Sequence, residues 1–274
     1  MIFYLSCTGN TRWAAAYLSR ALHEPLVNVA EVRLKDVCEW HLGRDEAVGF
    51  CFPVHGWRPP RLLREWIARQ RFVCPPEGQP YTFALCTVGD TTGEALDVFG
   101  HDLRQSGLKV HAAFSVCLPN TYVGLPFMDV DATARAQAKW HAAQGEMSQA
   151  VCSIANRAEG NYDAHAGRWR RINTRVLGKY FTEHLLTDSP FRVDAQQCTK
   201  CGLCAKVCPV GNIRQAENDV PHWLHQGDCL TCFACYHACP QKAIAYGART
   251  KGKGQYRAAS FRLAAEKEVK ETEK

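Results

Sequence analysis

The sequence lacks the features that would carry a chain across a membrane. No apolar run reaches the roughly eighteen residues that a membrane-spanning helix requires. The first residues, Met1 to Leu5, run into a polar turn with neither a basic leader nor a small-residue cleavage site, so no secretory signal is visible. We therefore expect no membrane span and a cytoplasmic protein.

Glycine-rich nucleotide signatures are also missing. No G-x-G-x-x-G follows a predicted strand, and that spacing is the usual mark of a dinucleotide site. A nicotinamide cofactor is therefore not expected to bind to this chain. Any electrons that the chain handles would have to come from a protein partner.

Cysteine, by contrast, is abundant. The chain has 15 cysteines, an odd number that argues against a closed set of disulfides and favours metal ligation in a reducing compartment. Eight of them crowd into residues 198–239, which indicates a separate domain. The other seven are scattered, mostly within apolar runs, and are interpreted as small buried hydrophobic residues: Cys7, Cys38, Cys51, Cys74, Cys86, Cys117 and Cys152.

The eight crowded cysteines form one motif that occurs twice. Each copy reads C-x2-C-x2-C-x3-C-P, and the copies start 31 positions apart. Three cysteines at two-residue gaps can aim their sulfurs at one [4Fe–4S] cubane, whereas the proline after the fourth directs that residue elsewhere. Each repeat then lends its fourth thiolate to the cluster of the other repeat. The predicted ligands are Cys198, Cys201, Cys204 and Cys239 for one cluster, and Cys229, Cys232, Cys235 and Cys208 for the other.

Three alternatives compete with this interpretation. A zinc site uses two spaced cysteine pairs and would leave four of the eight sulfurs idle. A radical-SAM cluster requires the three-residue gap first, an order that this segment does not have. Two purely structural clusters would keep the metal without moving electrons, and the sequence leaves that alternative open.

Residues 191–247 resemble a bacterial-type two-cluster ferredoxin, which is a small α+β domain. The resemblance includes two short apolar runs, Phe191–Val193 and Ala243–Tyr246. In that family the two runs pair as small strands around the clusters, and the resemblance implies the same pairing here.

The first 125 residues alternate β-branched or aromatic runs with amphipathic stretches. This pattern is typical of an α/β fold, a doubly wound parallel sheet with helices on both faces. Helices are predicted at Arg12–Leu22, Arg61–Arg69 and Glu94–Gln105. Five strands are predicted, at Ile2–Ser6, Leu26–Val32, Ala47–Val54, Thr82–Val88 and Val110–Leu118.

Residues 129–190 show no strand signals, only helical patterns that break near Gly160. We interpret them as a helical bridge between a domain at 1–128 and the cysteine-rich domain at 191–247. A polar, lysine-rich tail at 248–274 is expected to fray. The second helical pattern carries a basic cluster, which is either a solvated face or a docking patch: Arg168, Arg170, Arg171, Arg175 and Lys179.

The polar turn directly after the first predicted strand suits a phosphate. Backbone N–H groups at a helix start, with the hydroxyls of Ser6, Thr8 and Thr11, form a concave array of donors. Gly9 permits close approach of the backbone. The turn contains no basic residue, which favours a monophosphate over a nucleoside triphosphate. The same residues would also serve as a simple helix cap.

Loops after the third and fourth predicted strands should meet this turn. In doubly wound sheets, ligands lie beyond the carboxyl ends of the strands at the switch point. The loop residues are Pro53, Val54, His55, Gly56 and Trp57, then Thr87, Val88, Gly89 and Asp90. Asn120 and Tyr122, after the fifth strand, are weaker candidates for closing the pocket.

The first 125 residues resemble flavodoxins, and the whole order resembles flavodoxin–ferredoxin fusion proteins found in anaerobes. The phosphate loop of flavodoxins is matched by Ser6, Thr8, Gly9, Asn10 and Thr11. The resemblance implies that FMN binds here, in a flavodoxin-like domain, and that Trp57 stacks on its isoalloxazine ring. Residues 87–93 contain no aromatic side chain, unlike the second flavodoxin loop. One flavin face is thus left to backbone or to a partner.

These interpretations give two hypotheses for function. In the first, the chain relays electrons singly between FMN and two low-potential [4Fe–4S] clusters, to or from a redox protein partner. In the second, it reduces a small oxidised substrate beside FMN, which requires a proton donor such as His55. A sensor with vestigial centres is disfavoured because all eight ligands are present.

The formal net charge of +6 does not indicate a nucleic-acid partner. Two clusters held by thiolates would remove about four charges, and an FMN phosphate about two more. The loaded protein would then be nearly neutral. Charge therefore gives little support to binding of nucleic acid.

Overall fold

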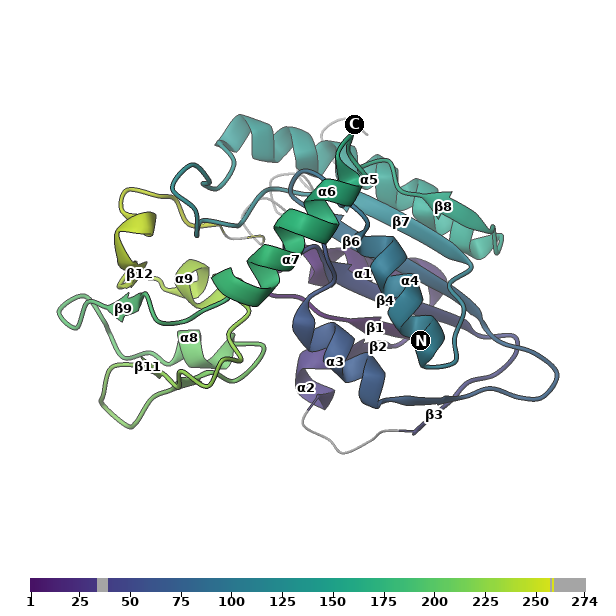
Figure 1. The fold of residues 1–274 in the computed structure, drawn as a ribbon, viewed down its shortest axis with the longest axis horizontal. Helices are drawn as coiled ribbons and strands as arrows, with labels where there is room; N and C mark the ends of the chain where they lie inside the picture. Colours follow the sequence, from purple (N-terminus) through teal and green to yellow (C-terminus); the bar gives the residue numbers. More distant parts are fainter. Residues whose placement is uncertain (34–38, 257, 259–274) are drawn as a thin grey trace, which may run out of the picture.

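The computed structural model describes residues 1–33, 39–256 and 258. Its N-terminal part is built on a six-stranded parallel sheet of order β2-β1-β4-β6-β7-β8 (Figure 1). Without β8, the strands of this sheet follow the order 2-1-3-4-5, one of the common doubly wound orders. The strands are β1 (Ile2–Tyr4), β2 (Leu26–Asn28), β4 (Ala47–Pro53), β6 (Tyr81–Val88), β7 (Ala112–Cys117) and β8 (Gly160–Tyr162).

The sequence predicts five of these strands and misses the sixth. The predicted strand at Leu26–Val32 is too long, because the Asn28 side chain accepts a hydrogen bond from the Ala30 N–H and starts α2 (Val29–Val32). β8 consists of three exposed residues that pair with β7 at the sheet edge. An edge strand without an apolar pattern leaves no signal in the sequence. The predictions of a five-stranded sheet and of no strand in 129–190 are therefore wrong.

Helices cover both faces of the sheet (Figure 1). Trp66 and Phe99 pack on one face, and Leu18 and Trp140 pack on the other. The helices of the first face are α3 (Arg61–Arg69) and α4 (Ala95–Gln105), and those of the second are α1 (Asn10–Leu22) and α5 (Thr133–Ala155). A separate parallel pair joins β3 (Glu39–His41) to β5 (Arg71–Val73). Among the described helices, none is long and apolar enough to cross a membrane.

The segment predicted as a helical bridge, 129–190, has two different parts. Its first helix, α5, belongs to the core of the sheet. Its last part forms one continuous helical run from Arg170 to Leu185, which we call the crossing helix because it runs in front of the sheet towards α9 (Figure 1). The crossing helix consists of α6 (Arg170–Ile172), η1 (Asn173–Leu177), α7 (Gly178–Tyr180) and η2 (Phe181–Leu185), with π-helical turns at η1 and η2.

The C-terminal region has a small core of its own, made largely of aromatic side chains. Phe191 and Trp223 stack with ring centroids 4.9 Å apart, and Phe233 and Tyr246 close the cluster. Val123, from the loop after β7, is buried in the same core, so the two regions interlock. The elements are β9 (Phe191–Val193), α8 (Leu203–Lys206), β10 (Ile213–Arg214), β11 (His222–Trp223), α9 (Ala234–Ala238), β12 (Ile244–Tyr246) and η3 (Gly247–Thr250). β9 pairs antiparallel with β12, which confirms the pairing that the resemblance implies.

The start of the C-terminal tail is packed against the protein. Lys253 Nζ donates to the carbonyl oxygens of Val123 and Met128, and Tyr256 is buried, with its hydroxyl 2.6 Å from Asn10 Oδ1. The predicted fraying is therefore wrong for residues 248–256. The rest of the tail, except residue 258, and Cys38 lie outside the described residues.

Candidate functional site

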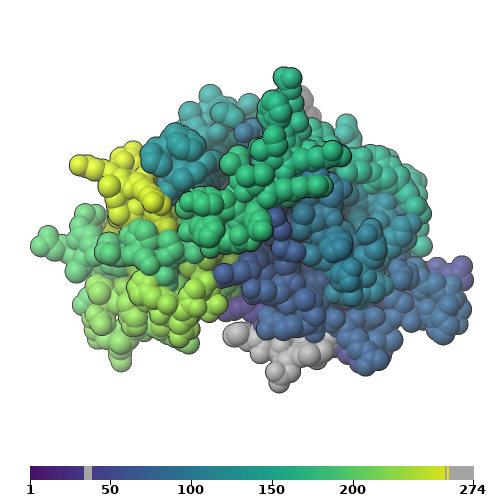
Figure 2. Space-filling model, viewed as in Figure 1, coloured from purple at the N-terminus to yellow at the C-terminus, as the bar shows by residue number. Residues whose placement is uncertain are grey.

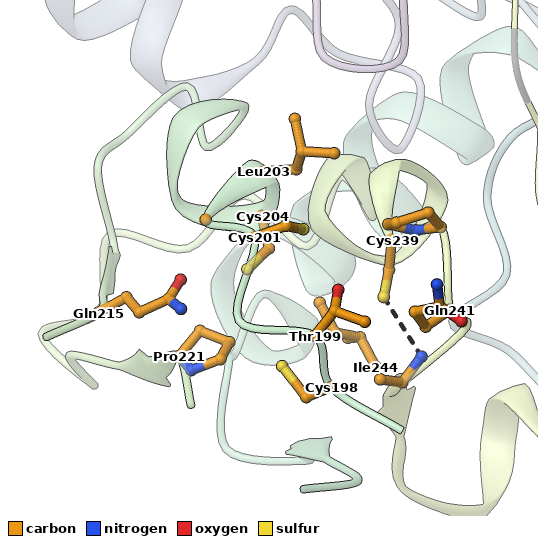
Figure 3. Close-up of a pocket in the computed structure, with 13 residues that line it drawn as sticks. Cys198, Thr199, Cys201, Leu203, Cys204, Gln215, Pro221, Cys239, Gln241 and Ile244 are labelled. Carbon is orange, nitrogen blue, oxygen red and sulfur yellow. Dashed lines mark hydrogen bonds between the residues drawn. The ribbon is translucent and has the colours of Figure 1, made fainter. Parts of the chain in front are cut away.

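The first group of predicted ligands surrounds a single hollow. Cys198 and Cys201 lie on the loop before α8, Cys204 lies within α8, and Cys239 follows α9. These four cysteines line a space of about 330 Å³, with their sulfurs turned towards one another (Figure 3). We call this space the first cysteine hollow. Three of its cysteines come from the first repeat and one from the second, as the spacing predicts.

The second group surrounds a matching space. Cys208 of the first repeat joins Cys229, Cys232 and Cys235 of the second repeat around about 310 Å³. We call this space the second cysteine hollow. The near-equal volumes and the exchanged fourth cysteine show that the two repeats form a pseudo-symmetric pair.

Backbone N–H groups point at the sulfurs at the same positions of both repeats. The donor lies two residues after the first cysteine of each motif and four residues after the fourth. The bonds are Lys200 N–H to Cys198 Sγ (3.4 Å), Thr231 N–H to Cys229 Sγ (3.3 Å), Asn212 N–H to Cys208 Sγ (3.3 Å) and Ala243 N–H to Cys239 Sγ (3.2 Å), the last drawn as a dashed line in Figure 3. Such bonds stabilise a negatively charged sulfur and tune the reduction potential of a cluster. The donor set therefore fits thiolate-held [4Fe–4S] clusters.

The sulfurs in each hollow are spread around a volume rather than gathered at a point. Among the described residues, no group of three or more His, Cys, Asp or Glu side chains surrounds a single ion. A cubane presents one iron to each thiolate, so its four ligands stand apart at the corners of a larger body. The arrangement thus fits a cluster better than a zinc ion, whose four ligands meet at one metal.

The two hollows differ in exposure. At the first, Cys201 is exposed, as are the neighbouring side chains of Thr199 and Gln241. The second is lined by the buried Leu230 and Phe233. Burial raises the pKa of the Cys229 thiol to about 12, so metal must displace the proton for the thiolate to form.

The predicted phosphate turn lies at the carboxyl end of β1 and leads into α1. Gly9 has φ +104° at the helix start, a left-handed conformation that favours glycine. The Ser6 hydroxyl oxygen is buried and has no hydrogen-bond partner among the described residues. A buried hydroxyl without a partner is costly. Ser6 does not line the large hollow described below, so the phosphate site stays a prediction.

Most of the predicted loop residues meet in one large hollow of about 1130 Å³, open to solvent. Ser6 and Gly9 do not line it, whereas the other predicted residues do: Thr8, Asn10, Thr11, Pro53, Val54, His55, Gly56, Trp57, Thr87, Val88, Gly89 and Asp90. Three of the turn's side chains also bond within the protein, and Thr8 Oγ1 donates to Thr121 Oγ1 at 3.3 Å. Thr11 Oγ1 lies 2.7 Å from Thr87 Oγ1, and Asn10 Nδ2 donates to the Pro119 carbonyl at 3.0 Å.

Trp57 is half-buried in the wall of this hollow and is held from both ends. Its indole N–H donates to Thr91 Oγ1 at 2.9 Å, and its carbonyl oxygen accepts from Thr174 Oγ1 of the crossing helix at 3.2 Å. The indole is thus fixed where a flat ring could stack on it.

His55 lines the large hollow but carries no extra proton near pH 7. Burial lowers the pKa of its imidazole to about 4, so the ring is neutral near pH 7. Its Nε2 lies 4.0 Å from the Cys7 sulfur. A neutral His55 can orient a ligand through a hydrogen bond, but it holds no extra proton for a substrate.

Several wall residues escape prediction because other segments carry them to the hollow. The loop after β7 contributes Thr121, Leu125 and Met128, besides the weaker candidates Asn120 and Tyr122. The crossing helix contributes Phe181, whose ring packs on Gly56 and lies 5.5 Å from Tyr122. The only signal available in the sequence was the position of Asn120 and Tyr122 after a strand end.

The cysteine loop of the second repeat also forms part of this wall. Leu230 and Cys232 line both the large hollow and the second cysteine hollow, and Thr231 lines the large hollow. The Cys7 thiol of the phosphate turn and burial together hold the pKa of Cys232 well above its ordinary value. One thin wall therefore separates the predicted flavin site from the second predicted cluster site.

Residues 191–240 match a family model described as a 4Fe-4S dicluster domain. Proteins named ferredoxin-like protein in nif region, from Trichormus variabilis and Trichormus azollae, are 47% identical over 45 residues, which is 16% of this chain and 38% of each relative. A protein of the same name from Nostoc sp. is 42% identical over 45 residues. The chain thus spans less than two fifths of the length of these curated relatives.

A solved structure, rubredoxin oxygen:oxidoreductase from the anaerobe Desulfovibrio gigas, aligns with a TM-score of 0.33 and 13% identity. The alignment covers 57% of this chain and 36% of that one, and so distant a likeness carries no argument. The family match supports a 4Fe–4S dicluster domain at residues 191–240, and together with the similarity to ferredoxin-like proteins it supports iron–sulfur binding and electron transfer for this region.

Proposed function

We propose that this protein relays electrons between FMN in the large hollow and two [4Fe–4S] clusters in the two cysteine hollows, in the manner of a flavodoxin–ferredoxin fusion. The observation that carries the proposal is the shared wall, in which Leu230 and Cys232 line both the large hollow and the second cysteine hollow. A ferredoxin domain tethered at random would not offer a cluster ligand to a flavin site.

The residues of each site fit the group assigned to it. The phosphate turn would hold the FMN phosphate through its backbone N–H groups and Thr8, and Trp57 would hold the ring. The crossed cysteine sets would each hold one cluster. When bound, FMN takes up electrons singly or in pairs, whereas each cluster takes up one.

The difference in exposure between the two cysteine hollows indicates which of them a protein partner would contact. Cys201 is exposed at the first hollow, and Phe233 and Leu230 shield the second. We infer that a redox protein partner binds beside the first cysteine hollow. Electrons would then pass between the first hollow and the large hollow through the second cysteine hollow. The missing dinucleotide signature supports a protein rather than a nicotinamide as that partner.

The hypothesis of a small-substrate reductase has less support. It relies on His55 as a proton donor, and burial keeps that imidazole neutral by lowering its pKa to about 4. The relay requires no acid or base at the flavin.

The proposal is tested by measuring the iron and FMN content of the purified protein and its FMN content after reconstitution. Anaerobically purified protein should contain about eight irons and one FMN, because eight thiolates and one phosphate turn are present. Zinc in place of iron, or about four irons, would remove the two-cluster assignment. Full iron without FMN, after reconstitution with the free cofactor, would leave the clusters but contradict the relay.

A further inference from the structure

Exposed large hydrophobic side chains are concentrated on the crossing helix and on the residue before it. Among the described residues, nine large hydrophobic side chains are exposed, and five of them lie within residues 169–180. In Figure 2 this segment spreads in green across the front of the molecule. We call the five side chains the outer stripe: Trp169, Ile172, Val176, Leu177 and Tyr180. Such a concentration marks an interaction site more often than isolated exposed residues do.

The opposite face of the helix fixes the stripe in its outward position. The buried Thr174 accepts a hydrogen bond from the Glu94 N–H at 2.8 Å and donates to the Trp57 carbonyl. Gly178 lies so close that an added Cβ would overlap the carbonyl oxygen of Gly56. Because side chains three or four residues apart share one helix face, the stripe cannot turn inwards without breaking these contacts.

Basic side chains border the outer stripe. Residues 168–185, which comprise the crossing helix and the two residues before it, carry five lysines and arginines and one acid, Glu183. The Arg168 guanidinium lies over the Trp169 ring, 5.4 Å from its centroid. Arg175 pairs with the buried Glu94 at 2.7 Å, and Lys179 lies 4.0 Å from Glu183. The border is positive even after these pairs are counted.

The charge and shape of the outer stripe indicate which kind of partner binds to it. In a second copy of this chain, two positive borders would meet, which is unfavourable. No stripe side chain lines the large hollow or either cysteine hollow, so none of these three spaces gives the stripe a pocket for an anchor from a folded protein, where binding energy usually concentrates. A convex apolar stripe with basic flanks and an aromatic side chain at each end is typical of a helix that lies flat in a lipid interface.

We propose that the outer stripe binds the surface of a bilayer that contains anionic lipids. Its aliphatic and aromatic side chains enter the boundary between headgroups and acyl chains, and the flanking arginines reach the lipid phosphates. Each basic residue near an anionic surface strengthens binding about fivefold. The helix then lies in the plane of the surface and does not span it. This proposal stands independently of the electron relay.

The test uses the cofactor-loaded protein with sedimenting vesicles. One set consists of phosphatidylcholine with phosphatidylserine, and the other of phosphatidylcholine alone. We expect binding to the anionic vesicles, weakening as salt increases, and little binding to the neutral ones. Val176→Glu should lower the partition coefficient at least about tenfold, because it places a charge in the apolar contact, and Arg170→Gln should lower it about fivefold.

Leu26→Glu is the matched control, because Leu26 is an exposed apolar residue of β2, outside the crossing helix. It should bind vesicles like the unaltered protein, and the iron content of every variant should be unchanged. The proposal is overturned if the protein stays in solution with anionic vesicles at low salt. Equal losses for Val176→Glu and Leu26→Glu would also overturn it. The proposal would also be overturned if light scattering showed a dimer that Val176→Glu dissociates, while the protein did not bind to vesicles.

Discussion

The two cysteine hollows share a ligand geometry but not an environment. In both, three sulfurs come from one repeat and the fourth from the other, and N–H donors lie at equivalent positions. The first is bordered by exposed polar residues, whereas the second is buried against the N-terminal region. Duplication of the motif thus preserves the arrangement of the four cysteines, while the residues between the cysteines decide how exposed each hollow is.

Equivalent positions of the two repeats show how this difference is encoded. Lys200 and Thr231 both follow the first cysteine by two residues and both have positive φ, +57° and +48°. That conformation is unfavourable for a β-branched residue. Thr231 nevertheless keeps it, with its side chain accepting from the Thr187 N–H at 3.1 Å and donating to the Thr187 carbonyl. The first repeat presents a solvated lysine there, and the second a buried threonine tied to the end of the bridge segment.

The largest effect should come from removing thiolates in pairs. Cys208→Ser with Cys232→Ser removes two ligands of the second hollow, so one cluster should survive. Cys208→Ser with Cys201→Ser removes one ligand from each hollow, so both should be damaged. Electron paramagnetic resonance after anaerobic reduction counts the survivors, and circular dichroism separates cluster loss from unfolding. The reverse ranking would contradict the crossed ligand sets.

A smaller effect should separate the buried repeat from the exposed one. Phe233 of the second repeat is 1% exposed. The corresponding residue of the first repeat is Gly202, and the next residue, Leu203, is 40% exposed. Phe233→Ala should lower the free energy of unfolding by about 3–5 kcal/mol, and Leu203→Ala by less than about 0.5 kcal/mol. Denaturant unfolding under anaerobic conditions measures both. Similar costs would mean that the two repeats are equally buried.

At the large hollow, Trp57→Ala should weaken FMN binding about 5- to 150-fold while iron content stays unchanged. The range corresponds to about 1–3 kcal/mol for stacking of a flat ring on an aromatic side chain. Flavin titration followed by fluorescence measures the change, and Trp169→Ala, on the outer stripe, serves as the control. Unaltered affinity would show that the phosphate turn alone holds the flavin.

The smallest effect concerns a pair outside all three hollows. His165 Nε2 lies 3.1 Å from Glu146 Oε1, and this hydrogen bond raises the pKa of His165. A raised histidine pKa stabilises the fold fully below about pH 6.5 and ceases to do so as the pH rises through the folded-state value. His165→Gln should therefore cost less than about 1 kcal/mol at pH 6, because the pair is partly solvated, and almost nothing at pH 9.

For Glu146 the sign is opposite. Burial opposes its ionisation, but hydrogen bonds with His165 and with the Cys117 N–H lower its pKa overall. The stability that the lowered pKa of Glu146 contributes is fully present above the unfolded-state pKa of about 4.3. It is lost as the pH falls through the folded-state pKa of Glu146. Denaturant unfolding of the unaltered protein and of the His165→Gln variant, measured across the pH range, checks the loss of stability at high pH and at low pH. A cost that is larger at pH 9 than at pH 6 would contradict the assignment.

Local patterns in the sequence were sufficient for the parts of the site that depend on short-range spacing. The grouping of the cysteines around two hollows follows from two-residue gaps and a proline, and the position of the polar turn between β1 and α1 follows from the strand and helix patterns. Contacts between regions leave no such pattern. Phe181 and Thr231 reach the large hollow only because the crossing helix and the ferredoxin domain dock there. Polarity likewise predicts a loose tail at Lys253, where buried carbonyl oxygens in fact bind the ammonium group.

The central claim is that the second cysteine hollow connects the flavin with the first, and flavin reduction tests it most directly. Cys232→Ser and Cys201→Ser change equivalent ligands, one at the shared wall and one at the surface. The FMN-loaded variants are mixed anaerobically with a limiting reduced ferredoxin, and bleaching of the flavin absorbance is timed. The account predicts that both variants slow bleaching, and that a small diffusible reductant such as dithionite restores it in both. Bleaching by ferredoxin at the unaltered rate in Cys232→Ser, with its cluster lost and its FMN retained, would contradict the account.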